Sequence, residues 1–580
     1  MKKLLSGNEA IARGAYEAGI TVAAAYPGTP STEILENIGP YQDIYAEWAP
    51  NEKVALEVAV GASISGARVL AAMKHVGVNV AADPLFTVAY TGVNGGLVLV
   101  SADDPGLHSS QNEQDNRYYA KAAKVAMLEP SDSQEAKDFV QEAIRLSEEF
   151  DVPVLLRVTT RICHSKGLVE FGEREEAGIK PYERNMSKYI MAPANARKSH
   201  VSLEERLSKL EERSNNSPLN FIEWNDKKKG IITSGISYQY AKEVFGDSVS
   251  YLKLGMTFPL PHKMIDEFAK QVETLYVIEE NEPYIEEAIK VLGFDCIGKD
   301  KIPGIFELNP DIIERSLLGT EKDLLKTDMQ MPGRPPVLCP GCPHRGLFFA
   351  LSKKDAVVTS DIGCYTLGSA PPLNVGDTCI CMGASISAGH GFKKAMDKNG
   401  RKDKVFAVIG DSTFFHSGLT GLMDVAYNKG NVTVVIADNR ITGMTGHQDN
   451  PGTGKTLKGE DTIALDIPKI CNALGIEDVT VVNPLNLKEM RSAVNEAMKK
   501  EEPNVIVTKW PCALIKTEPQ PKGHCQVNQD ICTQCYACMQ IGCPAISKQD
   551  GKVVIDDTMC NGCGLCTQLC AFKAIEKVGE

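Results

Sequence analysis

Short apolar runs alternate with longer stretches of small or amphipathic residues through most of this 580-residue chain. That alternation is typical of strand–helix–strand units with a parallel sheet. In the N-terminal region, strands are predicted at 20–25, 97–101 and 152–159, and a proline-free helix at 52–72. A second helix is predicted to begin near Thr29, because threonine caps helices well and Pro30 suits the first helical position.

Polar segments divide the rest of the chain. A charged connector at about 185–218 precedes predicted strands at 231–234, 251–254 and 275–279, and a linker at about 319–336 precedes strands at 357–360, 405–409, 432–437 and 505–509. We therefore predict an α/β protein with two doubly wound domains, a smaller α/β domain and a cysteine-rich C-terminal module. The doubly wound domains are predicted at 1–190 and 335–515, the smaller domain at 218–318 and the C-terminal module at 524–580.

Composition excludes several classes of protein. The hydrophobic content of 43% is ample for several cores, and the formal charge of −13 argues against a nucleic-acid-binding protein. No run of about 18 apolar residues is present, and no signal-peptide pattern follows the N-terminus, so we expect no membrane association. Many unpaired cysteines indicate a reducing compartment, and we expect a cytoplasmic protein.

Eight cysteines near the C-terminus form two phased runs. The runs are Cys532-x2-Cys535-x2-Cys538-x4-Cys543-Pro544 and Cys560-x2-Cys563-x2-Cys566-x3-Cys570. A zinc ribbon would need two paired knuckles for each ion, whereas each run has three close cysteines and a more distant fourth. The spacing is similar to that of iron–sulfur cluster ligands, and this resemblance implies an electron-transfer function, with zinc ribbons and disulfides as the alternatives.

The two runs resemble the bacterial two-cluster ferredoxin, with one extra residue before Cys543 and Ala571 where a proline is usual. In that family the fourth cysteine of each run reaches the other cluster. The resemblance therefore implies two [4Fe–4S] clusters with interleaved ligands. One set is Cys532, Cys535, Cys538 and Cys570, and the other is Cys560, Cys563, Cys566 and Cys543.

A second motif lies at the ends of two predicted strands. Gly410-Asp411-Ser412 follows the strand at 405–409, and Asp438-Asn439-Arg440-Ile441 follows the strand at 432–437. The pair resembles the thiamine diphosphate motif, GDG followed by NN. Neighbouring parallel strands would bring Asp411 and Asn439 to one Mg²⁺ at their carboxyl ends, with a glycine turn beside the diphosphate. The resemblance adds the backbone carbonyl of Ile441 as a ligand.

The motif departs from its family at two positions. Ser412 replaces the third glycine of the motif, and Asp438 replaces the first asparagine. An ordinary strand followed by a turn is therefore the alternative interpretation of this segment.

Several further segments extend the likeness over nearly the whole chain. They are Tyr26-Pro27-Gly28-Thr29-Pro30-Ser31 and the stretches at 73–79, 103–114 and 338–344. Together with the thiamine motif and the cysteine runs, they resemble the 2-oxoacid:ferredoxin oxidoreductases, and within them the α subunits that act on indolepyruvate. The likeness is weakest at 160–330.

The resemblance implies a pyrimidine-binding thiamine domain at 1–190, a transketolase C-terminal-like domain at 218–318, a diphosphate-binding domain at 335–515 and a ferredoxin domain at 524–580. The implied reaction is oxidative decarboxylation of a 2-oxoacid such as indolepyruvate, with coenzyme A as acyl acceptor and ferredoxin as electron acceptor. A smaller β subunit in an α2β2 assembly is also implied, because single-chain relatives carry a domain that this chain lacks.

The family also implies a glutamate that activates thiamine, nine residues before a glycine of the following helix. Glu52 stands nine residues before Gly61 and Glu57 only four, so Glu52 is favoured and Glu57 suits a solvated helix face. By the same resemblance, Gly28 contacts the cofactor and Thr29 contacts the substrate, although a helix cap would also explain Thr29. His75 and His108 are either substrate-pocket residues or structural histidines.

A third cluster is a further prediction. Cys339, Cys342, Cys364 and Cys512 occupy positions that correspond to cluster ligands in related β subunits, so the resemblance implies a proximal [4Fe–4S] cluster. The alternative is that they are small buried hydrophobic residues. Of the other cysteines, Cys163, Cys296 and Cys471 are predicted to lie in cores, and Cys379, Cys381 and Cys525 have no predicted role.

Three other functions compete with this one. They are the same chemistry on another 2-oxoacid, a non-oxidative thiamine-dependent decarboxylase, and an electron-transfer scaffold without catalysis. Tandem clusters argue against the decarboxylase, which needs no electron acceptor. Asp411, Asn439 and Glu52 argue against the scaffold, which needs no site for Mg²⁺ and diphosphate.

Overall fold

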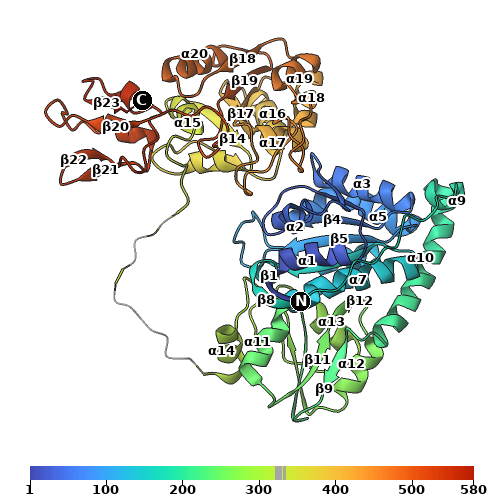
Figure 1. The fold of residues 1–580 in the computed structure, drawn as a ribbon. Helices are drawn as coiled ribbons and strands as arrows, with labels where there is room; N and C mark the ends of the chain where they lie inside the picture. Colours follow the sequence, from blue (N-terminus) through green and yellow to red (C-terminus); the bar gives the residue numbers. More distant parts are fainter. Residues whose placement is uncertain (321–328, 331–332, 334, 580) are drawn as a thin grey trace. The chain divides into compact units, whose positions relative to one another are not determined.

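The computed structural model describes residues 1–320, 329–330, 333 and 335–579 and divides the chain into two compact units, Met1–Asp328 and Met329–Glu580. Each unit contains a predominantly parallel sheet flanked by helices, which confirms the predicted α/β class (Figure 1). In the described part of the chain, no helix is long and apolar enough to cross a membrane. Most of the predicted linker at 319–336 lies outside the described residues.

The first unit is built on a seven-stranded sheet of order β12-β6-β7-β5-β4-β2-β3, in which only β12 is antiparallel to its neighbour. The strands are β2 (Val22–Ala25), β3 (Tyr45–Trp48), β4 (Val69–Lys74), β5 (Leu97–Asp103), β6 (Ala126–Leu128), β7 (Val154–Thr159) and β12 (Met256–Phe258). The helices of this region are α1 (Gly7–Glu17), α2 (Thr32–Ile38), α3 (Glu52–Ile64), α4 (His75–Val80), α5 (Ala82–Thr91), α6 (Arg117–Ala123), α7 (Ser133–Phe150) and α8 (Thr160–His164). Strands β1 (Lys2–Ser6) and β8 (Lys166–Glu170) form a separate two-stranded antiparallel sheet.

The sequence predictions for two helices beside this sheet are wrong. The helix predicted at 52–72 ends at Ile64, because Gly66 has a φ of +106° and turns the chain into the buried strand β4. The helix predicted to begin near Thr29 begins at Thr32. A turn closed by the Ser31 N–H and the Gly28 carbonyl (2.8 Å) occupies the preceding residues, so Thr29 does not cap the helix.

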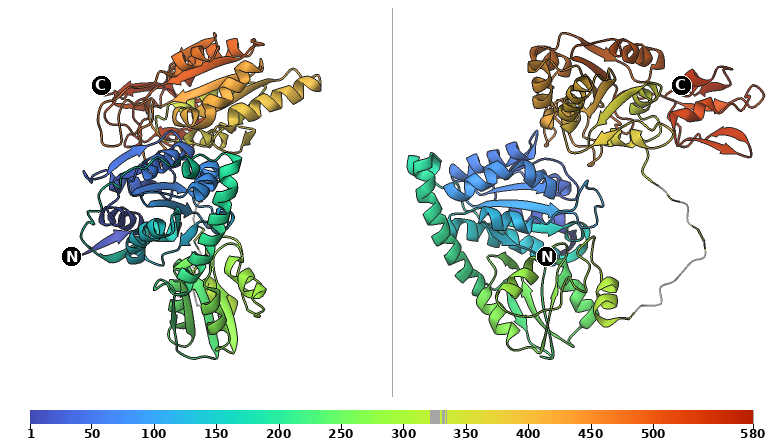
Figure 2. Two further views of the ribbon diagram at one scale, coloured as in Figure 1. Left: turned by 90° about the vertical axis from the view of Figure 1, so that its right-hand side faces the viewer. Right: turned by 180° about the vertical axis from the view of Figure 1, so that it is seen from behind.

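A four-stranded sheet of order β13-β10-β11-β9 forms the rest of the first unit. Its strands are β9 (Phe221–Glu223), β10 (Lys229–Ser234), β11 (Ser250–Leu254) and β13 (Thr274–Ile278), with helices α11 (Ile236–Phe245), α12 (His262–Ala269), α13 (Tyr284–Val291) and α14 (Pro310–Leu318). The predicted charged connector contains α9 (Met186–Tyr189) and the long helix α10 (Pro193–Asn215). Helix α10 runs beside both sheets and contacts α5 and α12 (Figure 2).

Strand β12 links the two sheets of this unit. It follows β11 in sequence but pairs with β6 of the larger sheet, with Met256 opposite Leu128. The Gly255 carbonyl also accepts a hydrogen bond from the Glu129 N–H at 2.8 Å. The small domain predicted at 218–318 therefore contributes an edge strand to the neighbouring sheet.

The second unit contains a fully parallel six-stranded sheet of order β15-β14-β16-β17-β19-β18. The strands are β14 (Ala356–Ser360), β15 (Thr378–Cys379), β16 (Lys404–Gly410), β17 (Thr433–Asp438), β18 (Val479–Val482) and β19 (Asn504–Lys509). The helices are α15 (His344–Leu351), α16 (Ala384–Lys398), α17 (Asp411–Thr413), α18 (Leu419–Tyr427), α19 (Ile467–Ala473) and α20 (Leu487–Ala497). The four strands predicted here are present, and the sequence prediction omitted β15 and β18.

The last sixty residues form two antiparallel pairs beside this sheet (Figure 1). One pair joins β20 (His524–Val527) to β23 (Ile575–Val578), and the other joins β21 (Ile546–Gln549) to β22 (Lys552–Ile555). Apolar residues of these segments share a core with the six-stranded domain, including Phe348, Ile541 and Leu565. The division into four domains remains a prediction, because compactness separates only the two units.

Candidate functional site

The carboxyl ends of β16 and β17 bring the predicted magnesium ligands together. These strands are adjacent and parallel, so Asp411 and Asn439 emerge at the same edge. The side-chain oxygen of Asn439 lies 3.1 Å from Asp411 Oδ1 and 2.9 Å from the Ile441 carbonyl oxygen. If the amide is turned over, its nitrogen donates to the same two oxygens.

The oxygen spacing at this edge suits a small cation. Mg²⁺ binds oxygen at about 2.0–2.1 Å in an octahedron, which places neighbouring ligand oxygens about 2.9 Å apart. The Asn439 oxygen at that separation from two other oxygens is repelled by both unless a cation or a donated hydrogen lies between them. The donor set of Asp411, Asn439 and Ile441 therefore fits Mg²⁺ in chemistry and in spacing.

Asp411 is almost completely buried, which makes its charge costly. Burial, and next the negative charge of Asp438, raise the pKa of Asp411 to about 7. Among the described residues, one side chain donates a hydrogen bond to this carboxylate: Asn450 Nδ2 lies 3.2 Å from Oδ2. A bound divalent cation would favour the ionised carboxylate and offset both effects.

Four cysteines adjoin this edge of the sheet. Burial, followed by the charges of Cys512 and Cys339, raises the pKa of the Cys364 thiol to about 11. Burial also raises the pKa of Cys342, to which Cys364 and Cys512 contribute. The Cys512 N–H donates to the Asn439 carbonyl at 3.0 Å, so the predicted third set of thiols lies beside the candidate magnesium site.

The C-terminal cysteines gather in two cavities. Four of them line the first cavity together with the apolar side chains of Val527, Val553 and Ile575. The cysteines of this set are Cys532, Cys535, Cys538 and Cys570. Three come from the first run and one from the end of the second, which is the interleaved partition that the ferredoxin resemblance implies.

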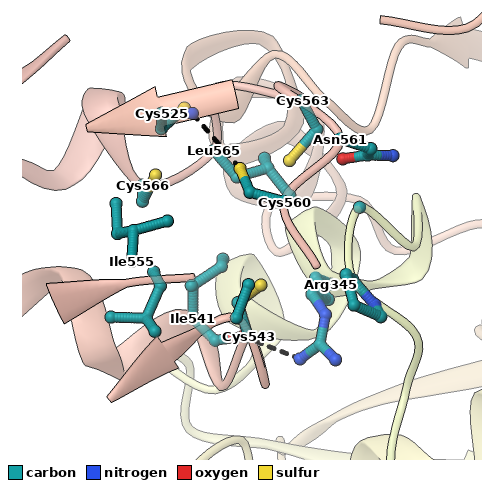
Figure 3. Close-up of a pocket in the computed structure, with 14 residues that line it drawn as sticks. Arg345, Cys525, Ile541, Cys543, Ile555, Cys560, Asn561, Cys563, Leu565 and Cys566 are labelled. Atoms are coloured by element: carbon teal, nitrogen blue, oxygen red, sulfur yellow. Dashed lines mark hydrogen bonds between the residues drawn. The ribbon is translucent and has the colours of Figure 1, made fainter. Parts of the chain in front are cut away.

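The second cavity collects the complementary set (Figure 3). Its predicted ligands are Cys543, Cys560, Cys563 and Cys566, and Ile541, Ile555 and Leu565 supply apolar walls. In the described part of the chain, no three His, Cys, Asp or Glu side chains converge on a position for a single metal ion. A [4Fe–4S] cluster instead takes one thiolate at each of its four irons.

Two residues of the second cavity were not identified from the sequence. Cys525 is 1% exposed, and its N–H donates to Cys560 Sγ at 3.3 Å. Arg345 also lines the cavity and donates from Nε to the Cys339 carbonyl at 3.1 Å. The sequence signal for Cys525 was its place on an alternating strand seven residues before the first run, whereas Arg345, three residues after Cys342, had no such signal.

In the first unit, the structure distinguishes the two candidate glutamates. Glu52 is the first residue of α3 and is 4% exposed. Its carboxylate packs so closely on Gly77 that a Cβ at that glycine would lie 2.8 Å from Glu52 Oε1. Glu57 has a side chain that is 47% exposed and forms an ion pair with Lys53 at 2.9 Å. Glu57 therefore occupies the solvated helix face.

Gly28 and Lys74 lie side by side at the carboxyl ends of β2 and β4. A Cβ at Gly28 would lie 3.1 Å from Lys74 Cδ, so a side chain at this position would require the lysine stem to shift by a few tenths of an ångström. Lys74 Nζ donates to the Ser109 carbonyl at 2.8 Å, and burial lowers the pKa of Lys74 to about 8 although Asp104 and Glu52 oppose the shift. Thr29, which follows Gly28, is partly exposed at this edge.

The two candidate histidines occupy different environments. His75 is fully buried, its Nε2 lies 3.1 Å from the Asn112 carbonyl oxygen, and burial lowers its pKa. His108 is about half exposed, and its Nε2 lies 3.2 Å from Glu307 Oε2. The ion pair of His108 agrees with the structural alternative for that residue. The buried Nδ1 of His75 has no hydrogen-bond partner among the described residues, so both alternatives for His75 remain predictions.

Two known families match parts of the chain. The family described as "Pyruvate flavodoxin/ferredoxin oxidoreductase, thiamine diP-bdg" matches residues 13–207, and "Thiamine pyrophosphate enzyme, C-terminal TPP binding domain" matches residues 361–508. The first match contains Glu52, and the second contains Asp411 and Asn439. Both matches support thiamine diphosphate as the cofactor.

Curated relatives match over the full chain. Subunits named indolepyruvate oxidoreductase subunit IorA are 44% identical in Pyrococcus abyssi, over 100% of this chain and 97% of the relative. The identity is 42% in Archaeoglobus fulgidus and 40% in Methanothermobacter marburgensis, each over 99% of this chain and 97% of the relative. These full-length matches confirm the family predicted from the sequence: the chain belongs to the indolepyruvate oxidoreductase IorA subunits.

Proposed function

We propose that this chain is the catalytic subunit of a thiamine diphosphate-dependent, ferredoxin-reducing oxidoreductase. Its substrates are indolepyruvate and other arylpyruvates, and its products are arylacetyl-CoA, CO₂ and reduced ferredoxin. The observation that carries the proposal is 39–44% identity to IorA subunits over the whole chain. Thiamine diphosphate supplies the carbanion chemistry when bound, and the protein supplies binding, orientation and electron transfer.

The diphosphate end of the cofactor is assigned to the edge of β16 and β17. Asp411, Asn439 and the Ile441 carbonyl would hold Mg²⁺, as their oxygen spacing of 2.9–3.1 Å supports. Gly410 and Ser412 flank the aspartate and would lie beside the diphosphate. At Gly410, a Cβ would lie 2.5 Å from the Tyr365 ring, so a side chain there would displace the wall of the site.

The activating carboxylate is assigned to Glu52. A carboxylate beside the aminopyrimidine ring can exchange a proton with N1′. The burial of Glu52 against Gly77 and the exposure of Glu57 both support this assignment. Gly28 and Thr29, at the neighbouring strand end, would contact cofactor and substrate respectively.

Electrons would leave the site through iron–sulfur clusters. Two [4Fe–4S] clusters are assigned to the two cysteine cavities, and a third is assigned to Cys339, Cys342, Cys364 and Cys512. The third set lies beside Asn439 through the Cys512 hydrogen bond, which suits a cluster that receives electrons first. A smaller second subunit in an α2β2 assembly completes the proposed enzyme, because the matching relatives are themselves named as subunits.

The deciding experiment is an anaerobic screen of 2-oxoacids with the reconstituted protein, its second subunit, coenzyme A and ferredoxin. We expect arylpyruvates to drive ferredoxin reduction and acyl-CoA formation in a ratio of about two electrons per acyl group. Release of CO₂ and aldehyde without ferredoxin reduction would favour the non-oxidative decarboxylase. Equal or better activity with aliphatic 2-oxoacids would overturn the substrate assignment but leave the reaction type intact.

A further inference from the structure

Arg345 is a buried cation that no described carboxylate neutralises. Arg345 is 2% exposed, and among the described residues no Asp or Glu forms an ion pair with it. Its guanidinium donates to backbone carbonyls only, namely those of Leu338, Cys339, Ile541 and Gly542. Carbonyl dipoles satisfy the hydrogen bonds of a guanidinium but not its net charge, so the positive charge remains uncompensated.

The groups that surround this charge are cysteine thiols from two sets. Burial lowers the pKa of Arg345, and the interactions that oppose this shift come from Cys543, Cys342, Cys563 and Cys339. Cys543 and Cys563 belong to the second cavity, and Arg345 lines that same cavity (Figure 3). Cys339 and Cys342 belong to the set beside the candidate magnesium edge. Arg345 therefore lies at the junction of two cysteine groups.

The first cavity differs in this respect. Its lining contains Cys532, Cys535, Cys538 and Cys570 but no arginine or lysine. Both cavities have apolar walls and four predicted cluster ligands, and Cys525 is a fifth cysteine in the second cavity. The molecule thus contains a charged cysteine cavity and an uncharged one.

A [4Fe–4S] core held by four thiolates has a net negative charge that grows by one unit on reduction. A fixed positive charge nearby stabilises the reduced state more than the oxidised state, and therefore raises the reduction potential. In a buried site this interaction is weakly screened by solvent and salt.

We propose that Arg345 is a potential-setting residue, which makes the cluster of Cys543, Cys560, Cys563 and Cys566 the stronger electron acceptor of the two C-terminal clusters. This inference rests on the proposed clusters. The step it governs is a one-electron transfer: the cluster core gains one electron, the donor loses one, and no bond or proton changes place.

The test is an anaerobic redox titration followed by electron paramagnetic resonance. The signals of the two C-terminal clusters are assigned with Cys535→Ser, which removes a thiolate of the first cavity, and Cys563→Ser, which removes one of the second. Cys342→Ser identifies the signal of the proposed third cluster. In the unmodified protein we expect the second cluster to become reduced at the higher potential. The reverse order would overturn the proposal even if no Arg345 variant could be purified.

Two substitutions then separate charge from packing. Arg345→Gln should lower the reduction equilibrium constant of the second cluster about tenfold, which is about 59 mV for a one-electron couple. The first cluster of the same protein is the internal control and should shift much less. Arg345→Lys keeps the charge but not the planar guanidinium. The reduction potential of the second cluster in this variant should therefore lie closer to the parent value than to the value in Arg345→Gln.

Other outcomes have distinct meanings. Equal shifts of both clusters in Arg345→Gln, or a lysine variant that behaves like the glutamine variant, would show that Arg345 acts through structure rather than charge and would overturn the inference. Absence of iron and of any cluster signal from the anaerobically reconstituted parent protein would instead overturn the proposed function. Ferredoxin reduction by the holoenzyme is then a secondary measurement.

Discussion

Asp411 and Asn439 follow two neighbouring parallel strands and place side-chain oxygens 3.1 Å apart at one edge of the sheet. We predict that Asn439→Ala weakens Mg²⁺-dependent binding of thiamine diphosphate by at least about 10–100-fold, because even outer-shell partners of metal ligands have effects of that size. Calorimetric titration with and without Mg²⁺ measures the change. Asn472→Ala, at an exposed position on α19, is the control. The assignment of Asn439 as a Mg²⁺ ligand would be contradicted if the variant kept the Mg²⁺ dependence of the parent protein. It would also be contradicted if Mg²⁺ had no effect on the affinity of the parent protein for thiamine diphosphate.

The second prediction concerns thiamine activation. Glu52→Gln preserves the shape of the side chain but removes the exchangeable carboxylate proton, so C2–H exchange should slow by about 10²–10⁴-fold, the usual range for general acid–base catalysis. Deuterium uptake at C2 of the bound cofactor measures it. Glu57→Gln is the matched control, because Glu57 is exposed on the same helix. Unaltered exchange in Glu52→Gln would assign the role to another residue.

The third prediction is an iron count. Anaerobically reconstituted protein should hold about twelve iron atoms per chain, four for each of three clusters, and Cys342→Ser should reduce the number to about eight. Cys471→Ser, a substitution in the hydrophobic core of the same domain, should leave the iron content unchanged. A parent protein with about eight irons that Cys342→Ser does not alter would show that the four cysteines beside the magnesium edge are packing residues.

The fourth prediction tests the interleaved partition. Cys570 follows Cys560, Cys563 and Cys566 in sequence but lies in the cavity of the other run. Cys570→Ser should therefore alter the spectrum of the first cluster and leave the second intact, whereas Cys543→Ser should do the opposite. Electron paramagnetic resonance of the reduced variants distinguishes the two patterns. A Cys570 variant that lost only the second cluster would mean that each run binds its own cluster.

Much of the site could be predicted because its residues follow buried parallel strands. The apolar runs before Asp411 and Asn439 fixed the strands, and adjacent strand ends then brought the two residues together. Strand β4 was not predicted because its composition does not differ from that of the preceding helix. Its sequence, Val-Leu-Ala-Ala-Met-Lys, continues the alanine-rich composition of α3, and only Gly66 marks the boundary.

Long-range packing accounts for what the sequence did not reveal. Lys74 acquires its lowered pKa from burial beside Gly28, and Arg345 acquires its place among cysteines from a segment almost two hundred residues away in the chain. Neither residue has a local pattern that distinguishes it from an ordinary surface cation. The preference for Glu52 over Glu57 came from family spacing, and burial of Glu52 agrees with it.

Strand β12 follows the smaller sheet in sequence but pairs with the larger one, and this pairing affects how the first unit folds. An N-terminal fragment that ends before residue 218 contains β6 but lacks β12. Strand β6 would then be an edge strand with unpaired N–H and C=O groups, which is a template for intermolecular pairing. A fragment containing only 218–318 would in turn expose the apolar faces of Met256 and its neighbours. The two sheets should therefore unfold in a single cooperative transition, and gene fragments that separate them should aggregate rather than yield independent modules.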